Sequence, residues 1–435
     1  MRKATIHNLG CKVNSYEAKA MEEMLEKEGY TLVSFDQFAD VYIVNTCTVT
    51  NIADRKSRQM LSKARKRNPD GVVIAVGCYV QSVDDRLLFD AGVDLIIGND
   101  NKHKLSKLLR EYWQEREGEQ IENKRSEVIN ISQSSMYEPL EITKLTRRTR
   151  GEIKIQDGCE QYCAYCIVPY VRGPVRSRPL ADIVEEATHF ARNGCREVVL
   201  TGINLSSYGM DLPAEEDLLL VVNKIHEIDS IERIRLGSLE PRTITEEFVK
   251  TLADLPKFCP HFHLSLQSGS DAVLRRMNRH YTTTDYEEKC RLIREFFENP
   301  GITTDVIVGF PGETREEYEE TKGFVDKIGF SEIHVFSYSP RKGTKAAAME
   351  NQVSSQVKTS RSKELIALGE KKKQEYRNKL VGKTVELLIE DEVVLDGLRR
   401  QVGYTKEYVK VAVESKENLK NCILAIDIRD ESQII

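Results

Sequence analysis

Residues 156–169 read QDGCEQYCAYCIVP and place three cysteines within eight positions. These are Cys159, Cys163 and Cys166, and they directly follow an apolar run that we expect to form a β-strand. Three thiolates so close in sequence can hold three corners of a cubane iron–sulfur cluster. Because no fourth ligand is adjacent in sequence, one iron would stay open to an outside molecule. A zinc knuckle that uses a remote fourth residue is the alternative.

This cysteine loop opens a long alternation of strand-like and helix-like segments. Helical patterns such as residues 182–194 and 315–329 separate the apolar runs, which predicts a parallel sheet covered by helices. Since a closed barrel needs eight units, we expect a partial (β/α)6 barrel with its site at the carboxyl ends of the strands. The six expected strands are GEIKIQDG (151–158), EVVLTGIN (197–204), RIRLGSLEP (233–241), FHLSLQSGS (262–270), TDVIVGF (304–310) and EIHVFSYS (332–339).

The first 110 residues show the same alternation, and we expect a flavodoxin-like parallel sheet there. Cys11, Cys47 and Cys78 each stand just past one of its expected strands. The carboxyl ends of parallel strands share one edge, so these distant cysteines can converge into a second incomplete set of cluster ligands. Three buried small thiols are the simpler alternative.

The remaining sequence predicts a linker and a third unit. We expect an N-terminal domain over residues 1–110, a polar linker over 111–144, a barrel core over 145–372 and a small all-β module over 373–435. Two stretches are locally basic on a chain of net charge −5. One runs from Lys144 to Arg178, and the other covers residues 357–383. Both are candidate phosphate-binding surfaces or, alternatively, solvated charged faces.

Composition excludes several protein classes. The chain has 435 residues, 40% of them hydrophobic, and its longest apolar runs are far shorter than the ~20 residues that cross a bilayer. Its beginning shows no signal-peptide pattern, so we expect a cytoplasmic protein that does not bind membranes. Ten cysteines then indicate metal or redox chemistry, or buried thiols, rather than disulfides. We expect structural roles for the four cysteines outside the two sets, which are Cys195, Cys259, Cys290 and Cys422. His261 and His263 share one strand face, and we expect them to be core or pocket-wall residues, with a pair of ligands as the alternative.

The C-x-x-x-C-x-x-C loop after a first barrel strand resembles that of the radical S-adenosylmethionine (SAM) enzymes. Over nearly its whole length the chain resembles the methylthiotransferases of that superfamily, and its tail, with GYTKEYVKV (403–411), resembles their RNA-binding TRAM module. It is most similar to the branch that modifies N6-threonylcarbamoyladenosine in tRNA. The resemblance is carried by GCKVNSYE (10–17), NTCTVT (45–50) with KSRQ (56–59), GCYVQ (77–81), the 156–178 segment, EVVLTGINLSSYG (197–209), RIRLGSLEP (233–241), HFHLSLQSGSD (261–271), RRMNRHYTT (275–283), TDVIVGFPGET (304–314) and HVFSYSPRKGT (334–344).

The resemblance implies two [4Fe-4S] clusters and SAM, two molecules of which are used per turnover. Cys159, Cys163 and Cys166 would bind the radical SAM cluster, and Cys11, Cys47 and Cys78 the second cluster. The resemblance also places SAM contacts on other residues. Tyr165 would lie beside the adenine, TGIN replaces the GGE motif of many radical SAM enzymes, and GFPG would bring backbone close to the cofactor; the residues concerned are Tyr165, Thr201, Gly202, Asn204, Gly309, Pro311 and Gly312.

The implied reaction is methylthiolation of C2 of N6-threonylcarbamoyladenosine at position 37, in the anticodon loop of tRNA. That C–H bond has no acidic proton, so radical chemistry is needed and no side chain is predicted to act as acid, base or nucleophile. Arg399 and Tyr404 are candidate RNA contacts. The sulfur donor and the electron donor stay open.

Two alternatives remain at this point. One keeps the chemistry and changes the substrate, to isopentenyladenosine in tRNA or to a ribosomal protein. The other is a metal-stabilised RNA-binding protein without catalysis.

Overall fold

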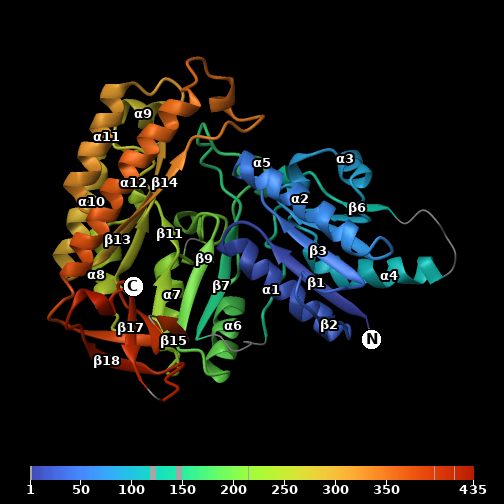
Figure 1. Ribbon diagram of the computed structural model, residues 1–435, viewed down its shortest axis with the longest axis horizontal. Helices are drawn as coiled ribbons and strands as arrows, with labels where there is room; N and C mark the ends of the chain where they lie inside the picture. Colours follow the sequence, from blue (N-terminus) through green and yellow to red (C-terminus); the bar gives the residue numbers. More distant parts are fainter. Residues whose placement is uncertain (1, 118–123, 144–148, 214, 396, 416) are drawn as a thin grey trace.

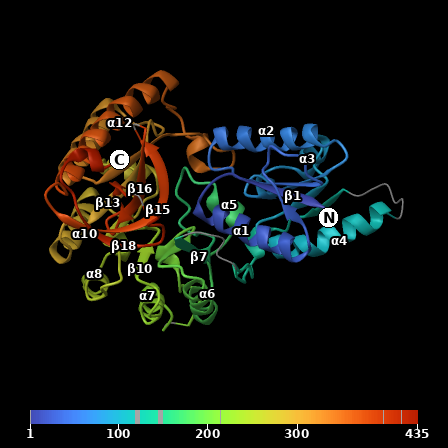
Figure 2. The same ribbon diagram turned by 60° about the horizontal axis from the view of Figure 1, so that its bottom comes forward.

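The computed structural model describes residues 2–117, 124–143, 149–213, 215–395, 397–415 and 417–435. An N-terminal α/β part, a central part with parallel strands and an antiparallel C-terminal sheet follow one another along the chain (Figure 1). The N-terminal part lies beside the central part, and helix α1 lies near their junction (Figures 1 and 2).

The N-terminal sheet is parallel and has the order β2-β1-β3-β4-β5-β6. Its first five strands follow the flavodoxin order, which confirms the expected fold. The sixth strand comes from the segment expected to be a linker, and it extends the sheet by pairing with β5. The strands are β1 (Lys3–Asn8), β2 (Thr31–Leu32), β3 (Val41–Thr46), β4 (Val72–Gly77), β5 (Leu95–Ile97) and β6 (Arg125–Glu127).

Helices cover both faces of this sheet (Figure 2). On one face, Met21 and Leu25 of α1 and Leu105 and Leu108 of α4 pack against alternate strand residues. On the other face, α2 and α3 pack against the intervening residues, as the two-residue period of a strand requires. The helices are α1 (Lys12–Lys27), α2 (Asn51–Arg67), α3 (Asp85–Asp90) and α4 (Leu105–Glu117).

The central part confirms the six predicted parallel strand units. They lie in two sheets, β10-β9-β7-β8 and β11-β12-β13-β14, which meet at Gly237 and are joined by a parallel bridge between Ile234 and Phe258. The short β8 is antiparallel to β7. The strands are β7 (Arg150–Asp157), β8 (Arg176–Ser177), β9 (Glu197–Gly202), β10 (Arg233–Leu236), β11 (Ser238–Leu239), β12 (His261–Leu264), β13 (Gly301–Val308) and β14 (Glu332–Ser337).

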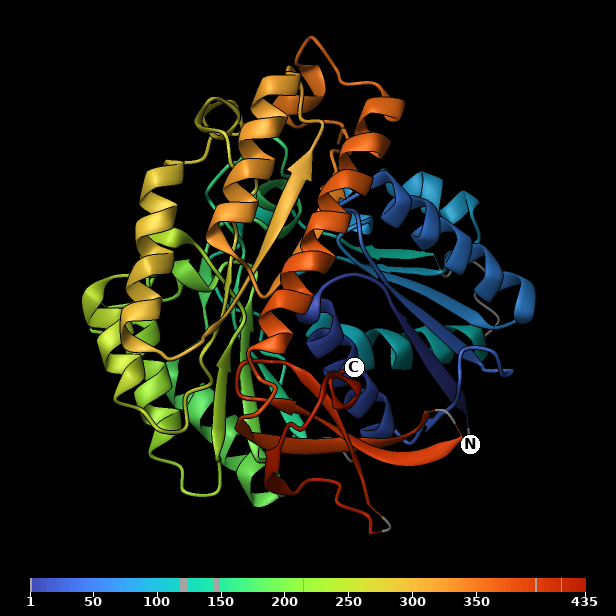
Figure 3. The same cartoon turned by 60° about the vertical axis from the view of Figure 1, so that its left-hand side comes forward.

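Helices surround these strands on the outside, as a partial (β/α)6 barrel requires (Figure 3). Their apolar faces and the outward-facing strand residues form one large core. The helices are α5 (Val168–Arg172), α6 (Leu180–Arg192), α7 (Leu218–His226), α8 (Glu246–Ala253), α9 (Asp271–Arg276), α10 (Thr283–Phe296) and α11 (Arg315–Ile328).

Helix α12 (Ser355–Asn378) runs along β14 and leads into the C-terminal sheet (Figure 3). That sheet is antiparallel with the order β17-β16-β15-β18, which confirms the all-β prediction. It packs against the ends at which the barrel strands begin, because Arg233 of β10 donates to the carbonyls of Tyr404 and Glu386, each at 2.8 Å. The strands are β15 (Thr384–Leu395), β16 (Leu398–Thr405), β17 (Lys410–Glu414) and β18 (Ile423–Asp427).

Burial corrects the interpretation of the first basic stretch as an RNA surface. Four of its cations are buried and lie in ion pairs, so they cannot meet phosphates; these are Lys154, Arg172, Arg176 and Arg178. Arg150 is partly exposed and pairs with Glu390 of the C-terminal sheet. The stretch's other three cations, Lys144, Arg147 and Arg148, lie outside the described residues. In the second basic stretch, which is mostly α12, Lys372 and Lys373 pair with Asp326 and Glu332.

Candidate active site

The loop after β7 holds Cys159, Cys163 and Cys166 in a fixed backbone. The N–H of Cys159 donates to the carbonyl of Gly173 (3.0 Å), and the N–H of Cys166 donates to the carbonyl of Cys163 (2.9 Å). Gly158 starts the loop with φ +73°, and a Cβ there would stand 1.7 Å from the carbonyl oxygen of Pro174. Only glycine tolerates both conditions, which explains the DGC sequence at this point.

Two polar side chains reach the sulfurs of this loop. Arg279 donates from Nη1 to the Sγ of Cys163 (3.3 Å), and Asn204 places its Nδ2 3.8 Å from the Sγ of Cys159. Glu240 joins both of them, at 3.3 Å from Asn204 and 3.6 Å from Arg279. Asn204 was predicted from the sequence as a site residue, whereas Arg279 and Glu240 were not, although both stand in motifs that carried the resemblance.

The chemistry of this loop fits an anionic group. Nη2 of Arg279 is buried and has no hydrogen-bond partner among the described residues. Thiols bind metal as thiolates, so a cluster on this loop would be anionic. The unpartnered guanidinium donor beside it suits that anion, and also a carboxylate of a small molecule bound to the cluster. Burial raises the pKa of Cys166 to about 12 and that of Cys159 above its usual range, so binding of a metal or cluster by these thiols would release protons.

The other residues predicted to contact SAM lie around the same loop. Half-buried Tyr165 packs on a small apolar cluster that contains Phe310 of the GFPG turn. Thr201 and Gly202 end β9, and the main-chain N–H of Asn204 donates to the side chain of Gln156 (2.8 Å).

Gly309 and Gly312 of that turn both have left-handed backbones, with φ +70° and +73°. Pro311 stands between them. Their N–H groups are already engaged, since Gly309 donates to Glu313 (2.8 Å) and Gly312 donates to the carbonyl of Asn351 (2.9 Å). These two donors are therefore committed within the protein, and any approach of SAM to the turn would use other atoms.

The second cysteine set lies at the carboxyl edge of the N-terminal sheet, after the neighbouring strands β1, β3 and β4. A Cβ on Gly10 would stand 3.2 Å from the Sγ of Cys47, so the loop that carries Cys11 passes directly over Cys47. Burial and the nearby thiols of Cys78 and Cys11 raise the pKa of Cys47 to about 11. The structure thus brings together three thiols that are up to 67 positions apart in the printed sequence.

Arg172 connects the second cysteine set to the barrel. Its Nε donates to the Sγ of Cys78 (3.2 Å), and its Nη2 donates to Asn14 of α1 (2.7 Å). Cys78 also packs against Ile167, the residue after Cys166, and against Val171. The two cysteine sets therefore lie on either side of the short helix α5. In the sequence Arg172 counts only as one cation of the first basic stretch, and its spacing from Cys78 gives no other signal.

A buried charge network surrounds Arg172. Glu17 of α1 accepts from Arg172 (2.6 Å) and from Lys154 of β7 (2.9 Å). The network has four cations and three carboxylates within the described chain, which leaves one positive charge beside Cys78. Thiolate-bound clusters are anionic, so this excess fits a cluster on Cys78. The members are Lys102, Lys154, Arg172 and Arg176 with Glu17, Glu138 and Asp157.

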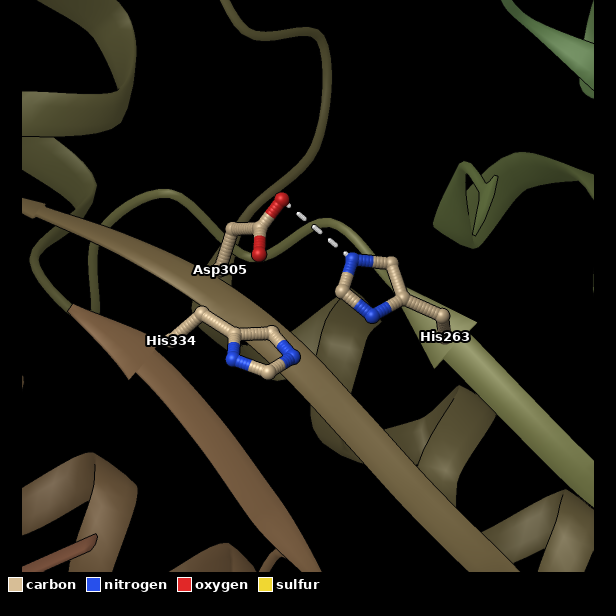
Figure 4. A group of neighbouring side chains, drawn as sticks. All are labelled: His263, Asp305 and His334. Carbon is tan, nitrogen blue, oxygen red and sulfur yellow. Dashed lines mark ion pairs between the residues drawn. The ribbon is translucent and has the colours of Figure 1, made fainter. Parts of the chain in front are cut away.

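The predicted histidine pair lies on the inner side of the barrel. His261 is buried and contacts the ring of Tyr408 in a tilted arrangement, with ring centroids 4.9 Å apart. Figure 4 shows His263 with Asp305 and His334; its Nε2 stands 3.3 Å from a carboxylate oxygen of Asp305. The ligand atoms of these three residues lie within 4.8 Å of one another, a closeness found for no other group of this kind in the described chain.

Such a group could hold a divalent ion. Both ring nitrogens of His263 are already engaged, however, because Nδ1 also contacts the hydroxyl of Thr303 at 3.0 Å. The group therefore serves as a hydrogen-bonded wall of the barrel interior, in agreement with the pocket-wall interpretation. In neither cysteine set do the three sulfurs lie this close together.

Comparisons with known proteins place the chain in a family. Residues 153–325 match the Radical SAM superfamily, and residues 3–98 match Uncharacterized protein family UPF0004. The chain is 38% identical, over 98% of its length and 94% of the relative, to the threonylcarbamoyladenosine tRNA methylthiotransferase MtaB of Bacillus subtilis. The chain belongs to the radical SAM methylthiotransferase family. It is therefore an enzyme, a transferase, and the family implies SAM and a [4Fe-4S] cluster.

Other relatives carry a different substrate in their names. The chain is 34% identical to the tRNA-2-methylthio-N(6)-dimethylallyladenosine synthase of Alkaliphilus oremlandii, over 96% of its own length and 88% of that relative. Among solved structures, the radical SAM methyltransferase TsrM from Kitasatospora setae, with cobalamin and a [4Fe-4S] cluster bound, matches with a TM-score of 0.58. At 16% identity, with 80% of this chain and 77% of that one covered, the match supports the fold of this methylthiotransferase alone.

Within the described ranges, no helix combines the length and the apolar character that crossing a lipid bilayer requires.

Proposed function

We propose that the enzyme methylthiolates C2 of N6-threonylcarbamoyladenosine at position 37 of tRNA. The observation that carries the proposal is the pairing of two separate three-thiol sites across helix α5, joined by the contact of Arg172 with Cys78. One site suits SAM cleavage, and a second site beside it suits delivery of sulfur. The relatives named MtaB support the choice of nucleoside.

In this proposal Cys159, Cys163 and Cys166 hold the radical SAM cluster. The second [4Fe-4S] cluster is held by Cys11, Cys47 and Cys78, and two SAM molecules are used per turnover. When bound, these groups supply the electron, the radical that breaks an unactivated C–H bond, the sulfur and the methyl group. Arg279 and Arg172 stabilise one thiolate at each site, because each donates to a sulfur.

The protein's own residues bind, orient and exclude water. Tyr165, Thr201, Gly202 and Asn204, together with the turn that contains Gly309, Pro311 and Gly312, form the proposed surroundings of SAM. C2 has no acidic proton, so no side chain needs to act as a base.

We further propose a division into an N-terminal methylthiotransferase domain (1–110), a linker (111–144), the radical SAM core (145–372) and a TRAM domain (373–435). The enzyme would act in the cytoplasm on the anticodon loop, with a separate sulfur donor and electron donor. Arg399 on β16 is available to RNA, since its side chain is 77% exposed and lies 3.5 Å from only one carboxylate, that of Glu392, in the described sheet. Tyr404 stacks on Tyr408 at 4.7 Å under Arg150, so its ring serves the junction with the barrel.

Nucleoside analysis tests the proposed substrate. Bulk tRNA from a strain that lacks this gene should lose 2-methylthio-N6-threonylcarbamoyladenosine and accumulate its precursor, as measured by mass spectrometry. Expression of the intact gene should restore the product, and expression of a Cys166→Ala variant should not.

The same measurement separates the alternatives. Loss of the methylthio form of isopentenyladenosine would instead assign the substrate of the relative from Alkaliphilus oremlandii. An unchanged nucleoside profile would overturn both tRNA substrates and leave the ribosomal-protein alternative. A protein that binds metal and RNA but releases no 5′-deoxyadenosine from SAM under reduction would overturn catalysis altogether.

A further inference from the structure

A cavity of about 310 Å³ lies where the three parts of the chain meet. Lys12 at the start of α1, Arg235 of the barrel and Tyr408 of the C-terminal part all line it. Pockets that bind small ligands begin at about 300 Å³, so the space suits a single base with its substituent. Because Lys12 follows Cys11 directly, one wall of this cavity borders the proposed sulfur-carrying site.

The charged groups that line the cavity are compensated, with one exception. The side chain of Lys12 makes no ion pair or hydrogen bond with any residue that the structure describes. The cavity therefore carries one free positive charge, and an anion would neutralise it. The compensated pairs are Arg150–Glu390 (2.6 Å), Arg235–Glu197 (2.8 Å), Glu152–Lys19 (2.9 Å) and Lys420–Asp391 (3.9 Å).

Local structure gives no reason for a lysine at position 12. It is the first residue of α1, where the positive end of the helix dipole makes a cation unfavourable. Its side chain is exposed rather than packed in a core. The charge of Lys12 also acts on a residue inside the barrel. The pKa of His261 is lowered well below its usual range, first by burial, then by Arg235 and then by Lys12. The ammonium group thus acts on the cavity and not on its own helix.

We propose that Lys12 binds the carboxylate of the N6-threonylcarbamoyl group and so selects this nucleoside over one with an apolar N6 substituent. The inference rests on the proposed function and names a contact within that site. The threonylcarbamoyl group ends in a carboxylate that is ionised at neutral pH, whereas an isopentenyl group has neither charge nor acceptor. An ammonium group offers three donors to such a carboxylate, and charge-assisted hydrogen bonds are the strong ones.

Binding measurements on the reconstituted holoenzyme test this contact directly. The probes are two anticodon stem–loop RNAs that carry N6-threonylcarbamoyladenosine either as the free acid or as its neutral methyl ester. Fluorescence anisotropy should show that the wild type binds the acid about 10- to 100-fold more tightly than the ester. Lys12→Gln should bring this ratio close to one, and Lys12→Arg should keep most of it.

Lys27→Gln is the matched control, because it removes the same charge from the far end of the same helix. It should keep the wild-type ratio. All variants should also keep the iron content and absorption spectrum of the wild type, which excludes an indirect effect through Cys11. In turnover, Lys12→Gln should raise KM for the acid RNA about tenfold or more and change kcat less.

Two results would overturn the inference. In one, Lys12→Gln keeps the wild-type preference for acid over ester. In the other, it weakens both RNAs equally, which would assign Lys12 to a backbone phosphate. These outcomes are separate from the fate of the proposed function. If the wild type forms no methylthio product, the function fails, yet the acid-to-ester ratio still tests Lys12. If product forms while the wild-type ratio is one, only the Lys12 contact fails.

Discussion

At the scale of single residues, each cysteine set is accompanied by one arginine that contacts a sulfur. Arg172 and Arg279 each donate to one sulfur, Cys78 in one set and Cys163 in the other. Metal binding needs thiolates, which are anions. At each site a fixed guanidinium stands 3.2–3.3 Å from one sulfur and can stabilise that anion. Both cysteine sets therefore combine three thiols with one arginine that donates to a sulfur, although the sets lie in different folds.

Replacing Cys47 with alanine should remove one cluster and leave the other in place. Anaerobically reconstituted Cys47→Ala protein should hold about four irons instead of about eight. It should still cleave SAM under reduction, because Cys159, Cys163 and Cys166 are intact, but it should form no methylthio product. Iron analysis, 5′-deoxyadenosine assays and mass spectrometry of the RNA nucleosides give the three readouts.

Removing one cysteine from the first set provides the comparison with Cys47→Ala. Cys166→Ala should lose SAM cleavage while keeping about four irons. Cys422→Ser, which changes a half-buried cysteine outside both sets, should keep both activities and all the iron. Product formation by Cys47→Ala at the wild-type rate would show that the second set is not required.

At the scale of elements, the loop from Gly158 to Gly173 determines the geometry of the first cysteine set. Both glycines have left-handed backbones. A Cβ on Gly173 would stand 2.3 Å from the carbonyl oxygen of Ile131, which belongs to the segment expected to be a linker. That segment therefore packs directly against the loop. Its contribution to the site could not be seen in its polar, aperiodic sequence.

Gly158→Ala should disrupt this loop more strongly than backbone strain alone explains. The added methyl would meet the carbonyl oxygen of Pro174 at 1.7 Å as well as adopting φ +73°. We expect about half of the iron to be lost and the unfolding free energy to fall by more than about 2 kcal/mol. Iron content and thermal unfolding measure the two effects.

Gly329→Ala separates strain from steric overlap. Gly329 ends α11 with φ +66°, and nothing lies within 4 Å of an added Cβ. This variant should cost only about 1–2 kcal/mol and leave the iron content unchanged. Equal losses in the two variants would contradict the steric explanation.

At the scale of the whole molecule, polar contacts join the N-terminal part to the barrel. One group of them is the network around Arg172. Another lies after β14, where Arg341 donates to Thr48 (2.7 Å), Asn51 (2.7 Å) and Asp54 (2.6 Å). These three residues follow Cys47 closely. The position of the second cysteine set relative to the first therefore depends on these paired charges together with the apolar packing of Tyr16 and Ala20 of α1 in the barrel core.

Acidification should weaken this junction. Burial alone would raise the pKa of Glu17, but Arg172, Lys102 and Lys154 lower it to about 2. Since the folded pKa lies below the unfolded value of about 4.3, the carboxylate stabilises the fold above pH 4.3. That stability, on the order of 3 kcal/mol, is lost as the pH falls towards 2.

Glu17→Gln provides the test. In the metal-free full-length chain, its unfolding temperature should lie well below that of the wild type at pH 7, because three buried cations lose a partner. The gap should narrow as the pH falls from about 4.3 towards 2, because the carboxylate of the unfolded wild type takes up its proton first and that of the folded wild type only near pH 2. A gap that stays constant over this range would show that ionisation of Glu17 does not stabilise the junction.

The sequence by itself determined the fold class, the six barrel strands, the flavodoxin-like sheet and the family, because apolar periodicity and short cysteine motifs are local signals. It also predicted that Cys11, Cys47 and Cys78 would lie at one sheet edge, since the carboxyl ends of parallel strands must meet there. Only the tertiary structure decided the partners of those cysteines. Arg172 and Arg279 read as surface cations or went unnoticed, because burial and pairing depend on side chains from distant parts of the chain. Likewise, Lys12 can be recognised as unpaired only from the tertiary structure, which shows that the charged residues around it are paired with one another.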